Sequence, residues 1–194
     1  MRSALLLAGL LAASPAAAEK PECVRNIEWA LSQLRAGKEV RRDWTFSERE
    51  ANEALTYLIR RQSKFKVSSA RLRLTGPREF AVSANAEVGD YLLGKLDADA
   101  EGLFGAALRR LLRDQNSIEV KGYFFGVKGM GYYKTRHAAI NGHGVPDSWI
   151  RKLTRLVGRH QRPPVDFNQL FLLPPGIEKI QIAQGTVKVR LRKP

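Results

Sequence analysis

Residues 70–88 read ARLRLTGPREFAVSANAEV, and apolar and polar side chains alternate along almost all of this stretch. Apolar residues alternate with arginines from Ala70 to Leu74, and the segment Phe80–Val88 repeats the pattern after the turn dipeptide Gly76-Pro77. A period of two puts one set of side chains on a single face of a strand. The stretch therefore predicts two antiparallel strands that bury one face.

The same alternation recurs toward the C-terminus. It predicts further strands around Leu96–Glu101, Ile118–Phe124 and Tyr132–Ile140, and a closing hairpin of IEKIQIA and TVKVRLRK with its turn at Gly185. The small inward residues of the middle strands, such as Ala84, leave two alternatives open: a tightly packed helix or room for a ligand.

Four segments follow a helical period instead: Glu22–Ala36, Ser47–Gln62, Leu103–Asp114 and Pro146–Arg159. The second begins with Ser47 and Glu50, the spacing of a capping box. Helices and strands in this order predict an α+β fold around a mostly antiparallel sheet.

The chain begins with MRSALLLAGLLAASPAAA, which has a basic start, a short apolar core and small residues before Glu19. We interpret residues 1–18 as a signal peptide and expect a periplasmic or secreted protein. We assign residues 19–43 to an N-terminal helical arm and residues 44–194 to a single domain. Cys23 is the lone cysteine, so we expect a small buried side chain at the start of a helix rather than a disulfide.

The formal net charge is +14, which favours acidic partners. Export argues against nucleic acid and leaves anionic lipid, lipopolysaccharide, acidic polysaccharide or an envelope protein. The alternative is that the charge only keeps the protein soluble.

The segment 141–160 holds two of the three histidines beside Asp147 and Ser148. It lacks the G-x-S-x-G signature of a nucleophilic serine, and Asp147 suits the start of the helix that follows. His137, His143 and His160 lack the tight spacing of zinc ligands. We therefore predict no catalytic residue, no metal site, no cofactor and no enzyme activity.

Three segments resemble parts of the LmeA-like phospholipid-binding proteins, exported proteins with features of TULIP lipid-binding domains. TFSEREANEAL (45–55) resembles their T-x-x-E-x-N-x-x-L helix start, and INGHGVP (140–146) resembles their turn before a helix. FLLPPGIEKIQIAQGTVKV (171–189) resembles their closing hairpin. The resemblance runs from about Trp44 to Lys193, in the same order, and leaves the N-terminal helix unexplained.

The resemblance implies a long curved antiparallel sheet that wraps around the helix Ser47–Gln62 and holds acyl chains in an apolar cleft. The cleft-lining residues would be Ala51, Leu55, Leu58, Ile59, Phe80, Val82, Ala84, Leu96, Ile118, Val120 and Phe124.

The basic charge adds the expectation of peripheral contact with an anionic membrane surface. The candidate head-group or membrane contacts are Arg109, Arg110, Arg113, Trp149, Arg151, Lys152, Arg155 and Arg159. For the helix 146–159, period and charge alone favour a core helix with a solvated basic back.

The function expected from these features is non-enzymatic binding or transfer of an anionic lipid or amphiphile. The alternative is an envelope interaction module with a filled core, which binds a protein or an acidic polysaccharide.

Overall fold

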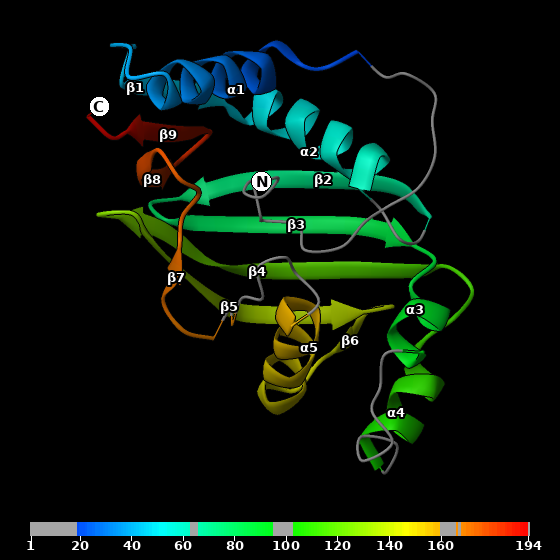
Figure 1. The fold of residues 1–194 in the computed structure, drawn as a ribbon. Coiled ribbons are helices and arrows are strands. Elements are labelled where there is room, and N and C mark those ends of the chain that lie inside the picture. Colours follow the sequence, from blue (N-terminus) through cyan, green and yellow to red (C-terminus); the bar gives the residue numbers. More distant parts are fainter. Residues whose placement is uncertain (1–18, 63–65, 95–102, 160–165, 167, 194) are drawn as a thin grey trace.

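The fold is taken from a computed structural model that describes residues 19–62, 66–94, 103–159, 166 and 168–193 (Figure 1). The predicted signal peptide and the strand expected around Leu96 lie outside these residues.

The described part of the chain is α+β. Its helices are α1 (Glu22–Arg35), α2 (Glu48–Gln62), α3 (Gly89–Leu93), α4 (Leu103–Leu111) and α5 (Asp147–Arg159). Its strands are β1 (Asp43–Ser47), β2 (Val67–Gly76), β3 (Glu79–Ala86), β4 (Asn116–Val127), β5 (Met130–Ile140), β6 (His143–Gly144), β7 (Phe171–Leu172), β8 (Ile177–Ala183) and β9 (Thr186–Leu191).

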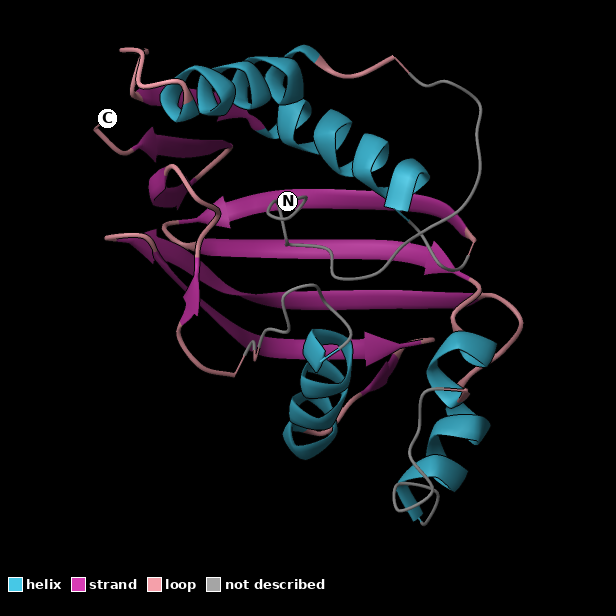
Figure 2. Cartoon of the chain, in the orientation of Figure 1, coloured by secondary structure: helices cyan, strands magenta, loops and turns pink. Residues whose placement is uncertain are grey.

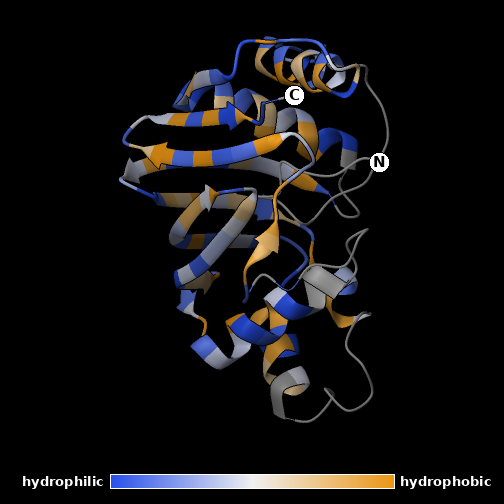
Figure 3. Ribbon diagram, turned by 60° about the vertical axis from the view of Figure 1, so that its left-hand side comes forward, coloured by the Kyte–Doolittle hydropathy of each residue, from blue (hydrophilic) through white to orange (hydrophobic). Residues whose placement is uncertain are grey.

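The strands form one antiparallel sheet in the order β1-β9-β8-β4-β3-β2, and β5 pairs with β4, β6 and β7 (Figure 2). β4 pairs with β3 from Asn116 to Tyr123 and then with β8 at Phe125 and Gly126. The C-terminal hairpin therefore continues the sheet beyond Glu79, the first residue of β3. Along the strands, hydrophobic and hydrophilic residues alternate (Figure 3), and the predicted antiparallel α+β architecture is confirmed.

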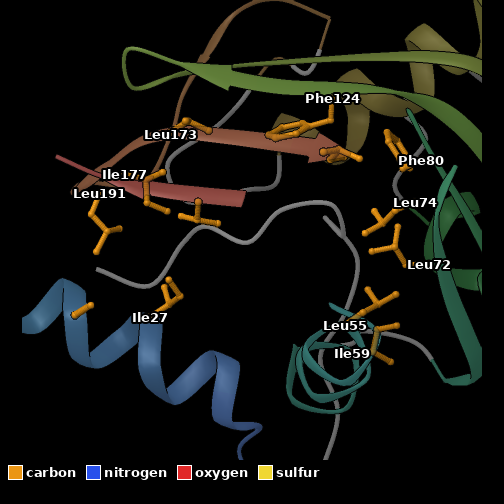
Figure 4. Packing of buried hydrophobic residues seen from close by; sticks show 13 residues of the cluster. Ile27, Leu55, Ile59, Leu72, Leu74, Phe80, Phe124, Leu173, Ile177 and Leu191 are labelled. Atoms are coloured by element: carbon orange, nitrogen blue, oxygen red, sulfur yellow. The ribbon is translucent and has the colours of Figure 1, made fainter. Parts of the chain in front are cut away.

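The largest hydrophobic cluster lies where the hairpin β8–β9 meets β2, β3 and β4. Ile27 from α1 and Leu55 and Ile59 from α2 point toward these strands (Figure 4). The strands contribute Leu72, Leu74, Phe80, Phe124, Ile177, Ile182, Val189 and Leu191. We call this set the corner cluster. Because α1 belongs to it, the N-terminal helix packs on the domain.

Cys23 belongs to a second contact between α1 and α2. It is buried with Val24, Ala54 and Tyr57, and its Sγ donates to the carbonyl oxygen of Glu50 at 3.4 Å. Burial raises the pKa of the thiol. The expectation of a small buried side chain at a helix start is confirmed.

The predicted capping box begins α2. The backbone N–H and the hydroxyl of Ser47 donate to Oε2 of Glu50 at 2.8 and 2.6 Å, and the N–H of Glu50 donates to Oγ of Ser47 at 3.2 Å. These bonds satisfy backbone donors that a helix start leaves without partners. They also lower the pKa of the Glu50 carboxyl.

Ser47→Ala should lower the free energy of unfolding by about 1 kcal/mol near neutral pH. A carboxyl whose pKa is lowered by folding adds stability above its unfolded pKa, and this stability is lost as the pH falls through the folded pKa. The difference between the wild type and the variant should therefore narrow in acid. Urea unfolding at neutral and acidic pH measures both free energies, and a difference that stays constant with pH would contradict this role of Glu50.

Asn52 and Glu48 of α2 cover the free edge of β2. The amide of Asn52 donates to the carbonyl oxygen of Leu72 at 2.8 Å and accepts from the Leu72 N–H at 2.7 Å. Oε2 of Glu48 accepts from the N–H of Leu74 at 2.7 Å. An edge strand with free backbone groups invites pairing with another chain, and here α2 occupies these groups.

Buried Asn116 joins the opposite end of β4 to α4 and β5. It donates to the carbonyl oxygen of Arg113 at 2.7 Å and accepts from the Arg113 N–H at 2.8 Å. Asn141 donates to the Asn116 side chain at 3.0 Å and to the carbonyl oxygen of Leu111 at 2.9 Å. The Asn in the INGHGVP segment therefore has a structural role, as has Asn52 in the TFSEREANEAL segment.

Several elements differ from the sequence prediction, and the strands β3 and β1 are two of them. The strand predicted through Val88 ends at Ala86, and Val88 precedes the short helix α3. The side chains of Ala86 and Val88 are both buried. The alternation of buried and exposed residues therefore continues past the end of the strand, although the backbone changes direction there. The strand β1 was not predicted, because it is short and forms by pairing with distant β9.

Candidate functional site

The inner face of the sheet, which carries α2 and α5, is apolar across its middle strands. One transverse row runs through Leu72, Val82, Val120 and Ala138, which are paired in register on β2, β3, β4 and β5. The next row runs through Ala70, Ala84, Ile118 and Ile140. The four residues of β3 and β4 in these rows, Val82, Ala84, Ile118 and Val120, are half-buried, and we call them the central floor.

The central floor lies between two groups of packed side chains. Val82 packs at the margin of the corner cluster, and Ile118 packs against a cluster formed by Ala86, Val88, Leu92 and Leu108. Within the described chain, Ala84 and Val120 belong to neither group. The two clusters thus close the ends of the inner face and leave its middle with less apolar cover.

Helices α2 and α5 lie at opposite sides of this floor (Figures 1 and 2). α2 packs on β2, and α5 contributes Trp149, Ile150 and Leu153 to the clusters that include Ile118 and Ala138. The described apolar side chains of α5 therefore face the protein, which agrees with the core-helix interpretation over the first two turns of this helix.

Of the predicted cleft-lining residues, Leu55, Ile59, Phe80 and Phe124 are packed inside the corner cluster, and Ala51 packs against it. Leu58 lies on the side of α2 that faces α1. These six contact other protein side chains, so the space directly under α2 is filled. The remaining predicted residues form the central floor, except Leu96, which lies outside the described residues.

Gly122 supplies no ligand space either. A Cβ at this position would lie 2.5 Å from the carbonyl oxygen of Lys134 and 3.3 Å from the ring of Phe80. Its small size allows the close approach of β5 and Phe80, so at Gly122 a strand and an aromatic ring take the space, in place of a helix or a ligand. Gly122 serves packing, and Ala84 is part of the floor.

Basic side chains lie on the helices that flank the β5 side of the floor. Arg109 and Arg110 of α4, Arg113 after it, and Arg151, Lys152 and Arg155 of α5 are all exposed. Trp149 is half-buried and packs inward, so it is not a free membrane anchor. The side chain of Arg159 lies outside the described part.

One polar pair lies at the margin of the inner face. Thr135 donates to the hydroxyl of Tyr133 at 2.8 Å, and the Tyr133 ring stacks on Phe80 with 5.8 Å between the centroids. Burial raises the pKa of the Tyr133 hydroxyl, so this group stays neutral over the ordinary pH range. Apolar sites commonly use a few such polar groups to orient a ligand.

A hollow of about 370 Å³ lies between α2, the residues Glu19 and Pro21 that precede α1, and Ala70 of β2, and its lining includes Arg49, Glu53, Thr56 and Arg60. Arg49 and Glu53 are 3.6 Å apart as an ion pair. No residue of the central floor lines this hollow, although Ala70, which pairs with Ala84, does.

The described histidines do not form a set of metal ligands. His137 and His143 are exposed on β5 and β6, and His160 lies outside the described residues. Within the described chain, no three His, Cys, Asp or Glu side chains converge on one point. Asp147 and Ser148 begin α5.

Comparisons with known proteins identify no relative. No protein-family model matches the chain, no curated protein matches it, and no solved structure matches its fold. The resemblance to LmeA-like proteins therefore stays a prediction. No helix in the described part has both the length and the hydropathy to cross a bilayer.

Proposed function

We propose that this protein binds an anionic lipid or a similar amphiphile, and that an acyl chain of this ligand lies on the central floor. The observation that supports this proposal is the half-buried apolar surface of Val82, Ala84, Ile118 and Val120 between two closed clusters. An acyl chain gains about 0.8 kcal/mol for each methylene group removed from water. A chain laid across the floor would cover apolar surface that the protein leaves partly exposed.

The basic residues of α4 and α5 supply the preference for an anionic head group. They flank the floor on its β5 side, and each Lys or Arg near an anionic lipid surface contributes about 1 kcal/mol. Arg110, Arg151 and Arg155 are exposed, so their guanidinium groups are accessible to a phosphate. Guanidinium and phosphate form paired hydrogen bonds readily.

The proposal includes a TULIP-like fold, in which the sheet curves around helical elements. It also includes export of the protein to the cell envelope. The support for the TULIP-like fold is the continuity of one antiparallel sheet from β2 to β1, with α1 and α2 packed at its corner. The ligand position differs from the one that the resemblance implied, because the side chains under α2 fill that space.

The filled corner cluster favours a second candidate function. A protein whose apolar space is occupied by its own side chains suits an envelope interaction module that binds a protein or an acidic polysaccharide. In that case the basic faces of α4 and α5 would contact the partner, and the central floor would stay empty.

Native mass spectrometry of gently purified protein, followed by lipid extraction, tests the proposal. We expect a protein species with added mass, and we expect extraction of the same sample to release an acidic amphiphile. Arg151→Glu/Arg155→Glu should lower the occupancy or affinity for anionic lipid at least about thirtyfold, since two favourable charges are lost. Both side chains are exposed, so the fold should be kept.

The matched control is Arg71→Glu/Arg73→Glu, which makes the same change of charge at exposed positions of β2. These side chains alternate with inward Leu72 and therefore lie on the other face of the sheet. The control should keep the bound lipid. Wild-type protein that carries no amphiphile and takes none up from anionic vesicles would favour the interaction module.

A further inference from the structure

A second exposed apolar surface lies at the end of the β4–β5 hairpin, on the opposite face of the sheet. Of the four large apolar side chains exposed in the described part of the chain, three are here: Val127, Leu170 and Leu172, at 46%, 63% and 77% exposure. Val127 pairs with Met130, and Met130 pairs with Leu172 of β7. We call Val127, Met130, Leu170 and Leu172 the tip patch.

Pairing places Val127, Met130 and Leu172 on one side of the sheet. Their neighbours Gly126, Gly131 and Leu173 meet on the inner side, where a Cβ on Gly126 would lie 2.7 Å from Leu173. Leu170 lies two residues before Leu172, just outside β7, and its side chain is 63% exposed. In Figure 3 both residues of β7 take the hydrophobic end of the colour scale.

The tip patch is held by regular backbone structure. Lys128 and Gly129 form the two-residue turn with φ of 52° and 76°, which is typical of a type I′ hairpin. Gly129 donates to the carbonyl oxygen of Glu178 at 2.8 Å and accepts from the N–H of Leu173 at 2.8 Å. Leu172 therefore projects from a paired strand of the sheet, and Leu170 directly precedes this strand.

Two cations lie at the turn beside the tip patch. Lys128 is exposed in the turn, and the guanidinium of Arg192 lies against Gly129. Of the other cations on these strands, Lys121 is paired with Glu119 at 2.8 Å and Arg190 with Asp43 at 2.7 Å, so Lys128 and Arg192 are the cations that we assign to the tip. Arg42 binds the Glu178 carboxylate at 2.8 Å, so this acid adds little negative potential.

We propose that the tip patch docks on an anionic membrane surface, with its aliphatic side chains in the interface and the adjacent cations at lipid phosphates. An apolar surface with adjacent cations suits this occupant, because the bilayer interface offers acyl carbon and phosphate together. A second copy of the chain would place the cations of the two copies near each other, which disfavours association. The inference does not depend on a ligand at the central floor, since an empty protein can dock.

Flotation with vesicles of phosphatidylglycerol and phosphatidylcholine, and with vesicles of phosphatidylcholine alone, tests this surface. Leu170→Asn/Leu172→Asn should weaken binding to the anionic vesicles at least about tenfold. Lys128→Asn should weaken binding to the anionic vesicles about fivefold and leave binding to the neutral vesicles unchanged. Asn tolerates the positive φ of this position, so the turn should form.

Trp29→Gln is the matched control, because Trp29 is the other large apolar side chain that is exposed in the described part, at 56% on α1. It should bind as the wild type does. The proposal is overturned if the wild type does not float with anionic vesicles, or if the double variant binds within about twofold of it. It is also overturned if Trp29→Gln loses as much binding, or if the tip patch proves to hold a dimer that the double variant dissociates.

Docking and carriage have separate readouts. The tip variants should keep any amphiphile seen by native mass spectrometry, and the charge variants of α5 should lose it. Failure of the vesicle experiment with a lipid still bound would refute the tip surface alone.

Discussion

Asn52→Leu should lower the free energy of unfolding by about 3 kcal/mol, because the Leu72 N–H and C=O would lose their partners at a part-buried edge. Asn52 makes hydrogen bonds of 2.8 and 2.7 Å to these two groups and a third of 2.8 Å to the carbonyl oxygen of Glu48. Leucine matches the side chain in size and offers neither donor nor acceptor. Urea unfolding followed by far-ultraviolet circular dichroism measures the change.

Asn52→Asp tests the cause. The introduced carboxylate can still accept from the Leu72 N–H, but it faces the Leu72 carbonyl oxygen with negative charge. We expect a loss at neutral pH that diminishes in acid, because the protonated carboxyl donates to that oxygen. The sign follows from linkage: the folded state would raise the pKa of the carboxyl, so the wild type and the variant converge as the pH falls below it.

Asn85→Leu is the control for Asn52→Leu. The Asn85 amide donates to Oγ of Ser69 at 3.0 Å on the exposed side of β3, and its removal should cost no more than about 0.5 kcal/mol. Equal losses of unfolding free energy in Asn52→Leu and Asn85→Leu would mean that the hydrogen bonds of Asn52 to β2 stabilise the fold no more than an exposed hydrogen bond does. The Asn52 variant should also aggregate more readily on unfolding, since the edge of β2 would be uncovered.

The hydrophobic periodicity predicted most of the helices and strands, because each of them buries one face and exposes the other. The capping box of Ser47 and Glu50 fixed the start of α2 within one residue, and the turn at Gly185 has the positive φ that joins β8 to β9. β1 was missed because its short DWTFS sequence gives a weak local signal and forms by pairing with β9.

Periodicity failed where it had to distinguish a filled surface from an open one. Phe80 and Ala84 both point to the inner face of β3, and the sequence gives them the same signal. Phe80 is 2% exposed in the corner cluster, while Ala84 is half-buried on the central floor. The difference depends on how far α2 and α5 extend over the sheet, which alternation within one strand does not encode.

The tip patch was missed for a related reason. Leu170 and Leu172 lie in a proline-bounded segment for which periodicity predicts no strand, and their apolar character suggests burial. Leu173 is indeed buried at 6% exposure, and Leu172 beside it is 77% exposed. Pairing of β7 with β5 decides which of the two faces outward.

Ala84→Trp should reduce amphiphile binding about a hundredfold, since an indole on the central floor would displace roughly four methylenes at about 0.8 kcal/mol each. Ala84 lies between Ala70 and Ile118 in the register of the sheet, so the ring would cover the middle of the floor. Native mass spectrometry after incubation with the lipid recovered from the wild type measures the bound fraction.

Ala81→Trp adds the same ring three residues away on the same strand. Ala81 pairs with Arg73 and Lys121, which are exposed, and it therefore presents its side chain on the outer face. This variant should bind lipid as the wild type does and unfold at a similar urea concentration. If both variants retain the lipid, the ligand does not lie on the floor; if both lose it, the loss comes from damage to β3. Only a selective loss in Ala84→Trp places the acyl chain between α2 and α5, on the surface that the protein's own side chains leave partly uncovered.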